Sequence, residues 1–95
     1  MKSIEVLVNG SRLCVAGSGP GEFTWASLTL DERGEIAASI QVAGSRGKTV
    51  PIWIDDCRIK EGDEVVLRIV EVVESNPPIV APPAWTEFPQ IKLDG

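Results

Sequence analysis

Few side chains in this 95-residue sequence could take part in catalysis. Histidine and tyrosine are absent, so the chain lacks the commonest general base and the commonest ligand of transition metals. No serine or cysteine stands in a nucleophile motif, because no histidine or suitably placed lysine accompanies it. The sequence alone leaves open a pair of carboxylates from distant parts of the chain. We nevertheless expect a protein that is not an enzyme and that holds no cofactor.

The two cysteines, Cys14 and Cys57, are too far apart in the sequence for a zinc-binding or redox pair. We expect them to be buried thiols in a reducing compartment, with a disulfide as the alternative. A calcium or magnesium site is not expected either. The acidic residues between positions 55 and 64 lack the residue order of a calcium-binding loop, so we interpret them as parts of solvated turns.

Two glycine-rich turns invite comparison with phosphate-binding loops. Residues 17–21 are followed by no Lys-Ser/Thr pair and lack the GxGxxG spacing, so we interpret them as a plain connection. Residues 44–48 form the only locally basic turn, in which Arg46 and Lys48 flank Gly47. Together with Arg12, this turn is a candidate site for an anionic ligand or a nucleotide. A solvated hairpin turn is the simpler interpretation.

The charge balance limits the partners. The formal net charge is −5 and the isoelectric point is near 4.6. Nucleic acids and anionic membrane surfaces are therefore disfavoured, because binding to them requires a basic protein surface. No segment has the apolar length of a signal peptide or of a membrane span. These observations predict a cytoplasmic protein.

The apolar residues follow the two-residue period of β-strands. Strand patterns cover residues 3–8, 11–16, 35–43 and 49–54. Asn9-Gly10 predicts a tight type I′ hairpin between the first two strands, because both residues tolerate positive φ. Residues 22–30 also fit a strand, which a turn at 31–34 connects to the next one. The helical spacing of Phe23, Ala26 and Leu30 keeps a helix open for this segment.

The longest apolar run, residues 60–74, begins with a Gly62-Asp63 turn and continues as a strand. Apolar residues occur on both of its faces, which is typical of a strand in the middle of a packed structure. We therefore predict that it is the central strand. In that position Arg68 and Glu71 must be paired or must reach the rim of the sheet.

Pro51 interrupts the pattern of the 49–54 strand. Because proline cannot donate a hydrogen bond to a neighbouring strand, this strand is expected at a sheet edge, or Pro51 at a bulge. The alternation places Trp53 on the outer face, where an aromatic side chain on an edge strand could bind a partner. Residues 55–59 are predicted to form one short helical turn.

Residues 77–95 differ in composition from residues 1–76, which we assign to a β domain. They contain five of the seven prolines, together with apolar side chains that include Trp85 and Phe88. An extended, polyproline-like path is expected. Apolar residues at this density need a surface, so the tail is predicted to pack on its own domain or on a partner subunit.

One resemblance rests on the opening Ile4–Gly17 segment and on the stretch from Trp53 through Gly62-Asp63-Glu64-Val65 to Pro77-Pro78. These segments resemble short uncharacterised bacterial proteins that share a β-strand start and a GDEV strand followed by a proline pair. The resemblance implies a bacterial β-rich protein and carries no function with it.

These features predict an all-β fold, an antiparallel β-sandwich or small open barrel of about six strands with an extended proline-rich C-terminal tail. The first functional hypothesis is a non-catalytic interaction protein, of the accessory or immunity type. It would bind another protein through the 49–54 edge strand and the tail, with Trp53, Trp85 and Phe88 as anchors. The alternatives are the anionic-ligand binder and a structural homo-oligomer formed by exchange of the tail.

Overall fold

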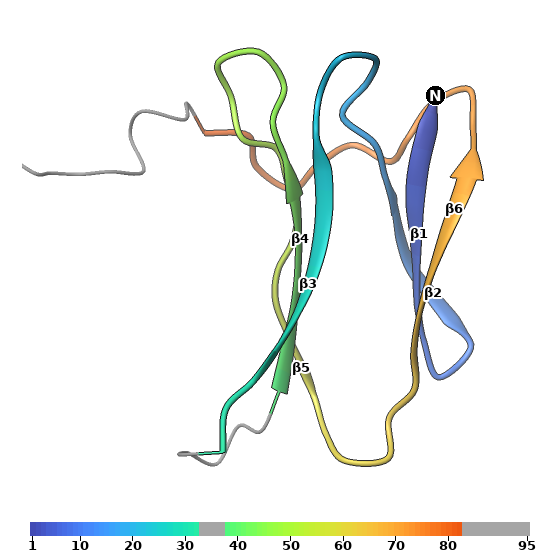
Figure 1. The fold of residues 1–95 in the computed structure, drawn as a ribbon, viewed down its shortest axis with the longest axis vertical. Helices are drawn as coiled ribbons and strands as arrows, with labels where there is room; N and C mark the ends of the chain where they lie inside the picture. Colours follow the sequence, from blue (N-terminus) through green and yellow to red (C-terminus); the bar gives the residue numbers. More distant parts are fainter. Residues whose placement is uncertain (33–37, 83–95) are drawn as a thin grey trace, which may run out of the picture.

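Two three-stranded antiparallel sheets lie as separate layers in the computed structural model, which describes residues 1–32 and 38–82 (Figure 1). The first sheet has the order β2-β1-β6 and the second has the order β3-β4-β5. The described residues include no helix and no closed barrel, so the predicted all-β antiparallel fold of six strands is confirmed. The strand bounds are β1 Lys2–Val8, β2 Ser11–Ala16, β3 Thr24–Leu30, β4 Ala38–Gly44, β5 Ile52–Ile59 and β6 Val65–Glu71.

The β1–β2 hairpin forms as the Asn-Gly pair predicts. Asn9 has a φ of 53° and Gly10 a φ of 84°, the positive values that a type I′ turn requires. The Asn9 side chain also binds the β5–β6 turn: its Nδ2 donates to Asp63 Oδ1 at 3.0 Å, and its Oδ1 accepts from the Glu64 amide at 2.9 Å. The two turns are thereby fastened together at one end of the molecule.

The core lies between the layers and takes residues from both. The first sheet contributes Val6, Cys14 and Ala16, and the second contributes Ile40, Val42, Trp53 and Ile59. Val6 and Val42 are completely buried, and Ile40 is 1% exposed. These residues sit on the central strands β1 and β4, each of which has a neighbour on both sides.

Within the segment 22–30, residues 24–30 form strand β3, so the helical alternative is wrong. The strand pairs with β4 along its whole length, from Thr24 opposite Gly44 to Leu30 opposite Ala38. The connecting turn predicted at 31–34 falls partly on residues 33–37, which lie outside the described residues.

The prediction that residues 60–74 form the central strand is wrong. β6 stands at the edge of its sheet, and Leu67 and Ile69 are 52% and 77% exposed. β1 occupies the centre instead, because it pairs with β2 through the hairpin and with β6 on its other side. The charged residue Arg68 is paired, as its place in a strand required, since its Nη1 lies 3.0 Å from Glu5 Oε1.

Two predictions about residues 49–59 are also wrong. Residues 55–59 continue strand β5 and form no helical turn. Trp53 does not face outward but lies in the core, 5% exposed. The register explains the reversal: Ile52 pairs with Ala43 and Ile54 with Val42, so Trp53 is the additional residue of a β-bulge. A bulge breaks the strict alternation on which the outward assignment depended.

Candidate protein-binding surface

One side of the sandwich, where β2 packs near β5, is closed by the chain that follows β6. Asn76 fastens it. Its amide donates to Val15 O at 2.9 Å, its Oδ1 accepts from the Val15 amide at 2.7 Å, and its carbonyl accepts from Trp53 Nε1 at 2.7 Å. Asn76 thus joins strand β2 of one sheet to the core tryptophan of the other.

The same segment then covers the free edge of β5. The Ile52 amide donates to Val80 O and the Val50 amide donates to Pro82 O, both at 2.8 Å. β5 is an edge strand of its sheet, as Pro51 predicted, and the start of this edge, at Val50 and Ile52, is already occupied. In Figure 1 this segment runs from the end of β6 across one end of the molecule to the opposite sheet. Residues 83–95 lie outside the described residues.

The opposite side of the sandwich is bordered by β3 and β6. Within the described residues each of these strands pairs with a single neighbour. Cross-strand partners point to the same face of a sheet, and Leu28 pairs with the buried Ile40 while Leu67 pairs with the buried Val6. Both leucines therefore face the core side of their sheets, although Leu28 is 59% exposed and Leu67 52% exposed.

Leu30 and Ile69 likewise face the core side of their sheets and are nevertheless exposed. Leu30 stands two residues beyond Leu28 on the same face and is 68% exposed, and Ile69 stands two residues beyond Leu67 and is 77% exposed. We call these positions the open-side residues: Leu28, Leu30, Leu67 and Ile69. They form the part of the inter-sheet face that the described chain leaves uncovered, and such apolar surfaces usually mark a binding site.

Hollows occur near both ends of β3. A depression of about 790 Å³ is lined by residues that include Thr24, Ile4 and Ile69. A smaller one of about 410 Å³ is lined by residues that include Leu30 and Ile59. Among the described residues, no group of three or more His, Cys, Asp or Glu side chains could hold a metal ion.

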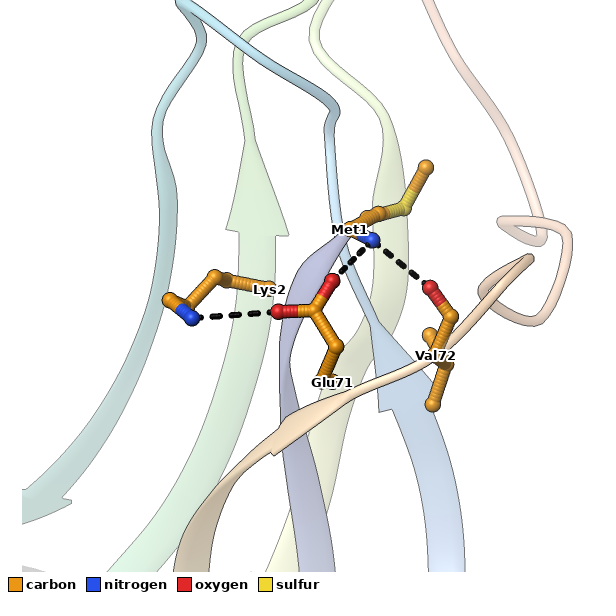
Figure 2. A network of polar contacts seen from close by, with 4 residues as sticks. All are labelled: Met1, Lys2, Glu71 and Val72. Carbon is orange, nitrogen blue, oxygen red and sulfur yellow. Dashed lines mark hydrogen bonds and ion pairs between the residues drawn. The ribbon is translucent and has the colours of Figure 1, made fainter.

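The larger hollow is bordered by a network of charges, shown in Figure 2. The amino group of Met1 donates to Glu71 Oε2 at 2.5 Å and to Val72 O at 2.7 Å, and Lys2 Nζ lies 3.0 Å from Glu71 Oε1. The hydrogen bond from the Met1 amino group, followed by that from Lys2, lowers the pKa of Glu71 below its usual value. The network ties the start of β1 to the end of β6.

The two strands that border the open side differ in charge. β6 carries Arg68 and Glu71, both in ion pairs. β3, with the sequence Thr-Trp-Ala-Ser-Leu-Thr-Leu, has no charged residue and no proline, and its pairing with β4 contains no bulge. Proteins normally protect an exposed edge strand with one of these devices. The edge of β3 is therefore well suited to pair with another strand.

The residues proposed from the sequence occupy other places. Trp53 is in the core, and Trp85 and Phe88 lie outside the described residues. Arg46 is engaged, because its Nε and Nη2 donate to Ser18 O and Gly17 O at 3.2 and 3.1 Å, and its guanidinium stands 6.0 Å from the Trp53 ring.

The three candidate cations for an anion site are not brought together. Arg12 follows the β1–β2 turn and lies 3.5 Å from Glu5, whereas Arg46 and Lys48 are in the β4–β5 hairpin. In Figure 1 these two hairpin turns lie at opposite ends of the molecule. Lys48 is exposed on its turn.

The cysteines are both free thiols in the structure, so the disulfide alternative is not realised. Cys14 is buried and Cys57 is half-buried, and burial raises the pKa of the Cys14 thiol. A buried thiol with a raised pKa is a poor nucleophile at neutral pH.

The sequence pointed to none of the open-side residues. A weak signal was present in β3, where seven successive residues carry no charge in a strand that lies at a sheet edge.

In the part of the chain that the structure describes, no helix has the length and apolarity to cross a membrane. The resemblance to short bacterial β-rich proteins stays a prediction. No protein-family model matches the chain, and comparisons with curated proteins and with solved structures gave no significant match.

Proposed function

We propose that the chain is a non-catalytic interaction protein that binds another polypeptide by adding a strand to the free edge of β3. The observation that supports this most directly is an uncharged strand edge that pairs with no other strand of residues 1–32 and 38–82, next to exposed residues of the inter-sheet face. In strand addition, backbone hydrogen bonds supply affinity and alternate side chains supply specificity. This replaces the 49–54 edge as the binding strand, because residues 79–82 already pair there.

The energetic gain would come from the open-side residues. Complete burial of a leucine or isoleucine side chain is worth about 1.5–3 kcal/mol, and each of these residues is already partly buried. Part of that gain offsets the entropy lost when two chains associate. A strand that also covers these residues would therefore bind more tightly than one held by backbone hydrogen bonds alone.

Leu28→Lys tests the proposal, because a charge on the inward face of an edge strand opposes further pairing. Val73→Lys is the matched control, since Val73 is 98% exposed and outside the open side. Tagged wild type and both variants are expressed in the source cells, and the proteins that co-purify are identified by mass spectrometry. We expect L28K to lose partners that wild type and V73K retain.

Retention of the same partners by L28K, with an unchanged far-ultraviolet circular dichroism spectrum, would refute binding at β3. Binding through Trp85 and Phe88 in the tail stays a separate prediction. It is tested by the same purification with residues 83–95 deleted. The anionic-ligand alternative is not favoured by any contact, since Arg46 donates to backbone carbonyls of its own chain.

A further inference from the structure

We propose that the polypeptide paired with β3 is the β3 strand of a second copy of this chain, antiparallel about a twofold axis. This inference rests on the proposed function and names the partner. Its starting point is the self-complementarity of the strand. When Thr24–Leu30 overlaps fully with its own copy, Ser27 lies opposite Ser27 of the other copy and Ala26 lies opposite Leu28.

The faces of the strands match in this arrangement. Thr24, Ala26, Leu28 and Leu30 pair with residues of β4 on the core face of the sheet. In the full overlap Thr24 meets Leu30 and Ala26 meets Leu28, so core-face residues meet core-face residues. A shift by one residue would place core-face residues opposite outward ones, which antiparallel pairing disfavours.

The distribution of charged residues also favours β3 as the strand that pairs with its own copy. Each copy carries a net charge of −5, so two copies repel each other overall. β3 is a seven-residue strand without any charge. Two β3 strands can therefore approach without placing like charges opposite each other, whereas a β6 pair centred on Arg68 would oppose two arginines.

The pairing of the β3 strands would also bury the exposed open-side residues. The twofold axis that joins the β3 strands brings the open sides of the two copies together. The open-side residues of each copy, Leu28, Leu30, Leu67 and Ile69, then face the same four residues of the other. Because a twofold interface uses the same patch twice, each exposed group meets apolar surface.

The assembly closes as a dimer. Pairing through β3 produces one six-stranded sheet in the order β5-β4-β3-β3-β4-β5. Its two outer strands are β5, whose first residue Ile52 is hydrogen-bonded to residues 79 and 80 of the same chain. A twofold interface uses the β3 edge of both copies, so no β3 edge remains to add a third copy and a fibre is not expected.

The first experiment measures the mass of the purified protein by analytical ultracentrifugation over a concentration series. Wild type and V73K are expected at twice the chain mass of 10.2 kDa. For L28K, in which each copy brings a lysine to the apolar contact, the dimer dissociation constant is expected to rise roughly 100-fold or more. A dimer of unchanged affinity in L28K, or an assembly that grows beyond the dimer, would overturn the proposal.

The second experiment locates the axis and does not depend on the folding of L28K. Ser27→Cys places two thiols opposite each other, so mild oxidation should give a covalent dimer. Thr29→Cys is the control on the same strand. In full overlap its two copies are about 14 Å apart, too far for a disulfide. Wild type measures the background from Cys14 and Cys57.

Cross-linking of T29C as efficient as that of S27C would refute this register. A wild type that stays monomeric at every concentration would refute the dimer. In that case the co-purification with L28K decides the proposed function separately. Loss of partners from L28K would keep strand addition by a different polypeptide, and their retention would refute both proposals.

Discussion

Trp53→Phe is the substitution that tests the arrangement of the core most directly. In the folded protein Trp53 is 5% exposed, and its Nε1 donates to Asn76 O at 2.7 Å. Phenylalanine removes this donor, and the lost hydrogen bond costs about 1 kcal/mol. The smaller ring adds a further loss of about 1–2 kcal/mol through the space it leaves. The expected total is about 2–3 kcal/mol.

Urea unfolding followed by far-ultraviolet circular dichroism measures this loss. A domain of this size has a stability of about 5–15 kcal/mol, so the variant should still fold. Its thermal midpoint should fall by roughly 8–24 °C, at about 4–8 °C per kcal/mol. Val73→Ala is the control, because Val73 is 98% exposed and outside the open side, and its replacement should change stability by less than about 0.5 kcal/mol. Equal losses in the two variants would refute the inward position of Trp53.

Three further predictions concern turns and contacts between elements. Gly44→Ala should lower stability by about 1–3 kcal/mol in urea unfolding, because a Cβ there would lie 2.5 Å from Phe23 O. Asn9→Ala should lower the urea midpoint, because alanine lacks the side-chain hydrogen bonds to Asp63 and Glu64 and also resists the φ of 53°. Asn9→Gly loses the same hydrogen bonds but accepts this φ, so it should lower the midpoint less. Equal losses in the two variants would contradict the role of φ. Because the pKa of Glu71 is lowered in the folded state, its contact with the Met1 amino group stabilises the protein above the usual glutamate pKa. This stabilisation is lost as the pH falls through the lowered value, so Glu71→Gln should be less stable than wild type near neutral pH, and the difference should vanish in acid. A difference that persists in thermal melts at about pH 2 would contradict this sign.

The amino-acid sequence determined the features that depend on neighbouring residues. Asn9-Gly10 set the first hairpin, because only residues that accept positive φ fit a type I′ turn. The strand pattern of residues 35–43 identified β4, in which Ile40 and Val42, two residues apart, are almost completely enclosed. Because β-strand periodicity is local, the all-β class and the approximate number of strands followed from it.

The tertiary structure decided the features that depend on strand order and on what covers a face. The apolar pattern of residues 65–71 identified a strand. The apolar residues on both of its faces did not show that β6 would stand at a sheet edge with Leu67 and Ile69 exposed. Trp53 turned inward because of a bulge, which arises from pairing with a strand distant in sequence. The exposure of the open side likewise depends on segments that are distant in sequence. Residues 75–82 close one side of the sandwich, and no pattern within β3 reveals on which side they pass.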